Sequence, residues 1–147
     1  MRAIKFRGKR VDNGEWVYGW FVKGECAYII TKKDFYNAVV SLPYSDGLSH
    51  LSTEVFQVIP ETVGQYIGLE DSSARSLEVY EEDIICYGGS YDFSGHKAVV
   101  KFWEGQFCIF RNLTDEFPLD MSLWKCLARC RGHVIGNVHD TPIAKER

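Results

Sequence analysis

Four residues near the end of the chain have side chains that bind transition metals. Cys126, Cys130, His133 and His139 follow one another with the spacing C-x3-C-x2-H-x5-H. Thiolate sulfur and imidazole nitrogen are the ligands of tetrahedral zinc sites. The spacing is not that of a C-x2-C knuckle, and an extended strand would separate the two histidines by roughly 20 Å. We therefore expect no metal and no cofactor, keep Cys126, Cys130 and His133 as the alternative metal site, and favour buried free thiols.

The same side chains would also suit covalent catalysis. A thiol of Cys126 or Cys130 next to His133 could become a nucleophilic thiolate. The sequence singles out no such pair together with an orienting Asp or Asn and an oxyanion loop. We expect a protein that is not an enzyme and has no catalytic residues, with a metal-dependent or thiol-dependent enzyme as the alternative from another functional class.

Carboxylates gather before a later apolar run. Glu78, Glu81, Glu82 and Asp83 could bind a hard cation or act as general acid and base. They match no EF-hand spacing, and no second acidic cluster accompanies them. A solvated turn at the start of a strand is the preferred interpretation.

A basic strand near the start is the best candidate binding surface. Residues 3–11 alternate, with Ile4 and Phe6 on one side and Lys5, Arg7 and Lys9 on the other, and Arg10 follows. Basic residues on one face can contact phosphates, and a neighbouring Trp or Tyr can stack on bases. They could equally solvate an edge strand and prevent aggregation. The net charge of −3 argues against non-specific binding to nucleic acid.

Length and composition indicate a folded protein of the cell interior. The 147 residues are enough for one domain, and the aromatic fraction of 14% favours strands. Five cysteines, an odd number and mostly in apolar runs, are typical of reduced thiols rather than disulfides. No apolar run reaches the roughly 20 residues of a membrane helix, so we expect a cytoplasmic protein without membrane contact.

Turn signals divide the first third into three strands. Asn13-Gly14 predicts a two-residue type I′ turn, and Gly24-Glu25 predicts a type II′ turn. Between them, Trp16, Tyr18, Trp20 and Val22 project to one face. Residues 32–52 predict a long loop, the alternation over residues 55–59 predicts another strand that ends at Pro60, and the polar segment 69–78 predicts a break between two halves.

The second half continues with strands and one helix. The run 83–89 predicts a strand, and residues 96–111 predict a hairpin with Glu104-Gly105 at its tip. Leucines and cysteines at helical spacing in 119–130 predict a short helix capped by Asp120 and stopped by Gly132. Residues 133–139 predict a closing strand that ends before Pro142.

Three stretches in this order resemble the YopX protein family of phages and prophages. They are "IKFRGKRVDNGEWVYG" near the start, "IGLEDSSARSLEVYEEDII" in the middle and "HVIGNVHDTP" at the end. The sequence departs from the family at Glu82, where a glycine is usual, and at "EDSSARSLEVY", which replaces an Asn-Gly turn. The resemblance implies a mainly β fold with an antiparallel meander over about 1–68 and a small SH3-like barrel over about 77–142. It implies no activity, cofactor or catalytic residue.

These observations lead to one expected function and its alternatives. We expect a mainly β, YopX-like phage or prophage accessory protein, with one short helix, that binds a macromolecule. A protein partner or a second copy is favoured, because the basic first ten residues are opposite in sign to the acidic segment 70–83. Binding of single-stranded nucleic acid through Lys5, Arg7, Lys9 and Arg10 is the alternative.

Overall fold

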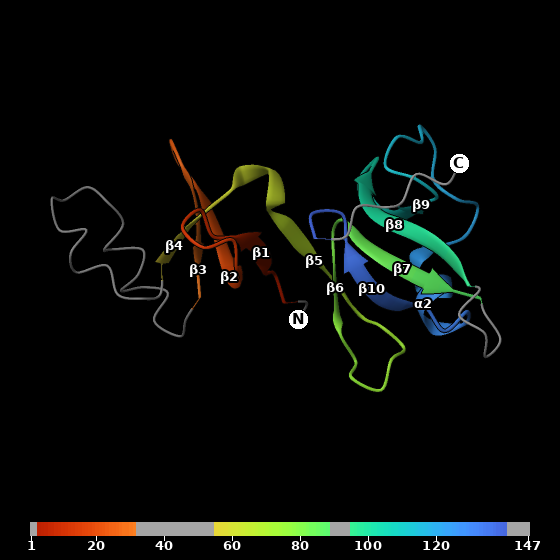
Figure 1. Ribbon diagram of the computed structural model, residues 1–147. Coiled ribbons are helices and arrows are strands. Elements are labelled where there is room, and N and C mark those ends of the chain that lie inside the picture. Colours follow the sequence, from red (N-terminus) through yellow and green to blue (C-terminus); the bar gives the residue numbers. More distant parts are fainter. Residues whose placement is uncertain (1–2, 32–54, 89–94, 141–147) are drawn as a thin grey trace, which may run out of the picture. The chain divides into compact units, whose positions relative to one another are not determined.

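The chain folds into two compact units, Met1–Gln65 and Tyr66–Arg147. The computed structural model describes residues 3–31, 55–88 and 95–140, so the expected loop over 32–52 and the chain end at Pro142 lie outside the described residues (Figure 1). Within these ranges the protein is mainly β with one short α-helix, which confirms the expected fold class. No helix in the same ranges is long and apolar enough to cross a membrane.

The first unit is an antiparallel meander, as the turn signals predict. Neighbours along the chain pair in the order β1–β2–β3–β4, and the start of β5 pairs with the other side of β1. Its elements are β1 (Phe6–Lys9), β2 (Trp16–Lys23), β3 (Ala27–Ile30), β4 (Val55–Val58), the 3-10 turn η2 (Pro60–Thr62) and the beginning of β5 (Gly64–Glu70).

The strands of this unit close on themselves. A bridge joins Arg10 to Val58, and backbone hydrogen bonds join Val11 to Gln57 and Ile59 to Lys9. The end of β1 therefore meets β4, while its start pairs with β5. Backbone pairing runs from β1 through β2, β3 and β4 back to the end of β1, which is how a sheet curls into a small closed structure.

A glycine in β2 makes this closure feasible. The strand pairs with β1 up to Gly19 and with β3 from Trp20 onward. A Cβ atom at Gly19 would lie 1.9 Å from the carbonyl oxygen of Ile30. Only glycine allows the two backbones to come this close, so Gly19 marks the corner of the strand.

Both turns of the meander differ from the predicted types. Lys9 pairs with Trp16, and the amide of Arg10 donates to the Glu15 carbonyl, so the first connection has four residues. Gly14 has a φ of 71° but Asn13 has no positive φ, which excludes a type I′ turn. The second connection, Gly24 to Cys26, has three residues, and Gly24 has no positive φ either. Asn13-Gly14 and Gly24-Glu25 correctly predicted where the turns lie, but not how many residues each turn contains.

The second unit contains a β5–β6 pair and a four-stranded antiparallel sheet in the order β10–β7–β8–β9. The elements are β6 (Glu78–Tyr80), β7 (Asp83–Tyr87), β8 (His96–Trp103), β9 (Gln106–Phe110), α2 (Leu123–Ala128) and β10 (His133–Asn137), shown in green to blue in Figure 1. The hairpin tip is confirmed, since Glu104 and Gly105 have φ values of 45° and 86°, as a type I′ turn requires.

One side of this sheet packs against α2. The core cluster contains Ile85, Ala98, Val100 and Ile109 from the sheet, Ile67 and Val79 from the β5–β6 pair, and Leu123, Cys126 and Leu127 from the helix. Burying this apolar surface is the main stabilising contribution to the unit. Cys126 is a fully buried thiol in this core, whereas the other four cysteines are partly buried.

Three boundaries in this half differ from the expectation. The helix is capped by Ser122, whose hydroxyl accepts from the Lys125 amide at 3.1 Å, and not by Asp120. Residues 64–70 form β5, which was not expected because Gly64 and Gly68 weaken a strand pattern. The polar segment 69–78 lies inside the second unit and not at the boundary, which falls within β5.

Candidate functional site

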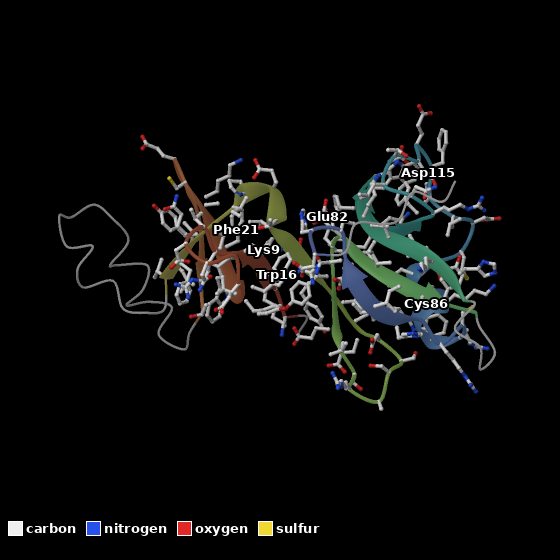
Figure 2. All side chains as sticks on the ribbon, in the orientation of Figure 1. Lys9, Trp16, Phe21, Glu82, Cys86 and Asp115 are labelled. Atoms are coloured by element: carbon white, nitrogen blue, oxygen red, sulfur yellow. The ribbon has the colours of Figure 1, made fainter. Side chains whose placement is uncertain are left out.

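The pairing of β1 with β2 places cations and aromatic rings on one face. Lys9 lies opposite Trp16 and Arg7 opposite Tyr18, and directly opposed residues share a face of the sheet. The Arg7 guanidinium lies 4.7 Å and the Lys9 ammonium 5.4 Å from the centre of the Trp16 ring, and Figure 2 labels Lys9 and Trp16. We call this surface, made of Lys5, Arg7, Lys9, Trp16, Tyr18 and Trp20, the cation–aromatic face.

Arg7 does not face solvent as the alternation predicts. Its side chain is 6% exposed, and its guanidinium stacks on Trp16. The β1 strand is also not an edge strand, because it pairs with β2 on one side and with β5 on the other. The expectation of a fully solvated basic row on an edge strand is therefore wrong for Arg7.

The Arg10 side chain is held in place by contacts with Asp12 and Phe56. Its guanidinium bonds to both carboxylate oxygens of Asp12, at 2.8 and 2.5 Å, and stacks 4.3 Å from the centre of the Phe56 ring. The hydrogen bond to Asp12 raises the pKa of Arg10, and the same bond lowers the pKa of Asp12. Arg10 thus joins the first turn to β4, at the point where the first unit closes.

Two large aromatic side chains of the cation–aromatic face reach solvent. Tyr18 is 48% and Trp20 39% exposed. They lie two residues apart on β2 and so project to the same face. The apolar core of this unit is built on the opposite face, from Val17 and Phe21 of β2 with Phe6, Ala27, Ile29, Val58 and Val63.

The C-terminal Cys and His residues do not form a metal centre in the described part of the chain. Within residues 3–31, 55–88 and 95–140, no three His, Cys, Asp or Glu side chains converge as a metal ion would need. Cys130 contacts the sulfur of Met121 at 3.8 Å, and the Nδ1 atom of His133 lies 3.3 Å from the Arg131 carbonyl oxygen. His133 pairs across the ladder with Cys86, and Cys126 lies in the core.

The thiol of Cys126 is poorly suited to nucleophilic chemistry. Burial, together with the neighbouring Cys130 and Cys86, raises its pKa to about 12. Such a thiol is protonated near neutral pH, while the thiolate is the reactive form. Cys126 acts in this fold as a small apolar side chain of the core.

The acidic segment is largely engaged within the second unit. The Asp83 carboxylate is 1% exposed and accepts from the Tyr80 amide at 2.8 Å. A Glu78 oxygen accepts from the Tyr80 hydroxyl at 2.7 Å, and Glu82 forms an ion pair with His139 at 2.5 Å. These three carboxylates therefore have structural contacts within the second unit.

Asp71 is a structural residue that the sequence patterns did not reveal. One oxygen accepts from the amide and hydroxyl of Ser73 and from the Leu77 amide, and the other accepts from the Val134 amide at 2.9 Å. Burial alone raises the pKa of Asp71, but these hydrogen bonds outweigh it, so the pKa lies below its ordinary value. The Asp-Ser-Ser sequence is typical of a turn closed by an Asp side chain, which was the available signal.

Comparison with known proteins gives a family and a fold. A search of the curated proteins finds no match to this chain. A solved structure, protein EF1440 from Enterococcus faecalis, is similar with a TM-score of 0.59 and 19% sequence identity, over 97% of this chain and 98% of that one. That likeness concerns the fold. The model of the YopX protein family matches residues 5–144, nearly the whole length. On this match, and on the three ordered motifs that run through it, the chain belongs to the YopX protein family.

Proposed function

We propose that this YopX family protein is a cytoplasmic accessory protein of phage or prophage type that binds a protein surface through the exposed aromatic part of its cation–aromatic face. The observation that carries the proposal is the neighbouring exposure of Tyr18 and Trp20 on one face of β2. Tyr and Trp supply much of the binding energy at protein interfaces, because they bury a large area with few rotatable bonds. A second copy of the chain is the first partner to test.

The state of the basic residues favours a protein over nucleic acid. Of the four candidate cations, Arg7 is buried and Arg10 is paired with Asp12. A net charge of −3 adds no long-range attraction for phosphates. The remaining basic side chains, Lys5 and Lys9, suit the rim of an aromatic patch better than a phosphate track.

We propose a non-catalytic function, in which the second unit is a small barrel that supports the first. The buried, protonated thiol of Cys126 supports the first point. The SH3-like form implied by the family resemblance remains a proposal, which an experimental structure of residues 66–147 in the intact chain would test.

The test replaces the two exposed rings in the intact protein. We expect concentration-dependent self-association of the wild type in sedimentation analysis, and its loss in Tyr18→Ser/Trp20→Ser. A control with Phe102→Ser/Trp124→Ser removes two rings of the second unit that are 54% and 55% exposed. A monomeric wild type at high micromolar concentration would rule out self-association, and equal loss in both double variants would rule out the Tyr18/Trp20 surface as its interface.

The protein-partner form has its own measurement. Cross-linking in host cells, followed by quantitative mass spectrometry, compares the wild type with the same two double variants. We expect at least one protein that is captured by the wild type and the control but lost with Tyr18→Ser/Trp20→Ser. If every captured protein is retained by that variant, the face does not bind a protein.

Single-stranded nucleic acid is the second candidate, favoured by one observation. The β1–β2 register sets cations directly beside aromatic rings, which is the combination that single-strand binders use. Fluorescence anisotropy with a labelled oligodeoxythymidylate would then show binding that weakens steeply with salt and is lost in Lys5→Glu/Lys9→Glu. The control is Lys23→Glu/Lys97→Glu, at two exposed lysines outside the face. Absent or salt-independent binding removes this candidate.

A further inference from the structure

Glu82 makes three contacts that tie the β6–β7 turn to other parts of the second unit. Its amide donates to the Val100 carbonyl of β8 at 2.7 Å, and its carbonyl accepts from the Val138 amide at 3.1 Å. Its carboxylate lies 2.5 Å from the Nε2 atom of His139. The residues after β10 are therefore fastened to this turn by a backbone bond and an ion pair (Figure 2 labels Glu82).

The backbone conformation at position 82 does not favour a glutamate. Its φ is 67°, in the left-handed region where a non-glycine residue is disfavoured by roughly 1 kcal/mol. Glycine would suit this conformation better. A side chain kept at such a position is expected to make a contact that offsets the cost, and the ion pair with His139 is the contact that the structure provides.

Hydrogen bonds of the Asn137 side chain hold the turn that contains His139. The side-chain oxygen of Asn137 accepts from the amides of His139 and Asp140, at 2.9 and 3.1 Å, and its nitrogen donates to the Asp140 carboxylate at 2.8 Å. Asn137 is 7% exposed and so holds the turn after β10 from within. The imidazole and the carboxylate of Glu82 stay partly open to solvent, at 21% and 31% exposure.

We propose that Glu82 and His139 form a pH-sensitive clasp that holds the end of β10 to the β6–β7 turn. Imidazole changes its charge in the physiological range, so the pair is ionic at mildly acidic pH and loses its cation as the pH rises. Along the chain, the titratable neighbours of the pair are Glu81 and Asp83 on the turn and Asp140 beyond His139, while β8 contributes the Val100 carbonyl.

The test is a double-mutant cycle on the intact chain. The wild type, Glu82→Gln, His139→Gln and the double variant are unfolded in urea at pH 6 and at pH 8.5. We expect the two sites to be coupled about threefold to tenfold in the unfolding equilibrium constant at pH 6, and close to onefold at pH 8.5. If the coupling factor in the unfolding equilibrium constant is one at pH 6, or is the same at both pH values, the proposal is overturned.

A local measurement separates the clasp from a general loss of stability. Hydrogen exchange by NMR compares the amide of Val138, which bonds to Glu82, with that of Val99 in the middle of β8. We expect His139→Gln to lower protection at Val138 several-fold and to leave Val99 nearly unchanged at pH 6. Equal loss at both amides, or no loss at Val138, counts against the clasp. Glu82→Gly should show the same local loss, although it relieves the backbone.

Discussion

Gly19 has the strictest requirement at the scale of single residues. A Cβ atom there would meet three backbone atoms, the oxygen and carbon of Ile30 and the Cα of Thr31, at 1.9, 2.7 and 3.1 Å. Backbone atoms cannot rotate away as a flexible side chain can. The space at Gly19 therefore depends on the pairing of β2 with β3.

Substitution of Gly19 should be severe even for the smallest side chain. We expect Gly19→Ala to lower the free energy of unfolding by about 3 kcal/mol or more, because a whole strand must shift. Gly24→Ala is the matched control, since nothing lies within 4 Å of the position that its methyl group would take and its φ is not positive. The control should change stability by less than about 1 kcal/mol. Urea unfolding measures both, and equal effects would contradict this account of β2.

Asp71 provides a residue-scale prediction for pH. Because its folded pKa is lowered, its contribution to stability is present above the ordinary carboxyl pKa of about 4 and is lost as the pH falls through the lowered value. The asparagine of Asp71→Asn has only one side-chain oxygen that can accept hydrogen bonds, whereas both oxygens of Asp71 do so. We therefore expect the free energy of unfolding to fall by about 1–3 kcal/mol at pH 7. The difference between wild type and variant should shrink below about pH 4. Urea unfolding from pH 7 to pH 3 checks this, and a constant difference would contradict it.

At the scale of elements, the start of helix α2 is fixed by one hydroxyl. The helix has six residues, too few to be stable by itself, so its capping contact and its packed face both matter. Leu123, Cys126 and Leu127 face the core, and Ser122 satisfies the Lys125 amide at the start. Asp120 and Ser122 are both good capping residues, and the backbone placed the serine at the helix start.

The two candidate caps can be separated by mutation. We expect Ser122→Ala to lower the free energy of unfolding by about 1 kcal/mol, and Asp120→Ala to change it by less than about 0.5 kcal/mol. Thermal unfolding followed by circular dichroism measures both. A larger loss for Asp120→Ala would restore the cap that the sequence pattern favoured.

At the scale of the whole molecule, the residues that the structure describes form two apolar cores. The first is built around Ala27, Ile29 and Val58, and the second around Ile85, Val100 and Ile109. Strand β5 contributes to both units, because Gly64 and Gln65 pair with β1 while Tyr66 and Glu70 pair with β6. Each unit thus has the packing it needs for its own cooperative opening.

Damage to one core should therefore be confined largely to its own unit. In Gly19→Ala we expect faster hydrogen exchange, measured by mass spectrometry, over β1 to β4, with β7 to β9 keeping most of their protection. Val100→Ala, a truncation of a fully buried side chain in the second core, is the reciprocal variant and should give the opposite pattern. Uniform loss of protection in both variants would show that the chain opens as one cooperative body.

Local patterns in the sequence were sufficient for the elements with strong short-range signals. The Glu104-Gly105 turn, the alternation in β2 and the spacing of Leu123, Cys126 and Leu127 depend on neighbours in the chain, and the fold confirms each of them. Residues 64–70 were missed because their pattern is weakened by glycine. The sequence predicts the position of the first turn correctly, but it predicts two residues where the structure has four. The length depends on the contact between the end of β1 and β4, which a local pattern does not report.

What the sequence determined by itself was the mainly β character, the family and the set of aromatic and basic residues on β1 and β2. Their exposure and pairing came from the tertiary structure: Arg7 is buried against Trp16, Arg10 is paired with Asp12, and Tyr18 and Trp20 are partly exposed. It also joined Glu82 to His139, which are 57 residues apart. The physical reason is that alternation reports which residues share a face of one strand, whereas exposure and charge pairing depend on strands that are distant in the chain.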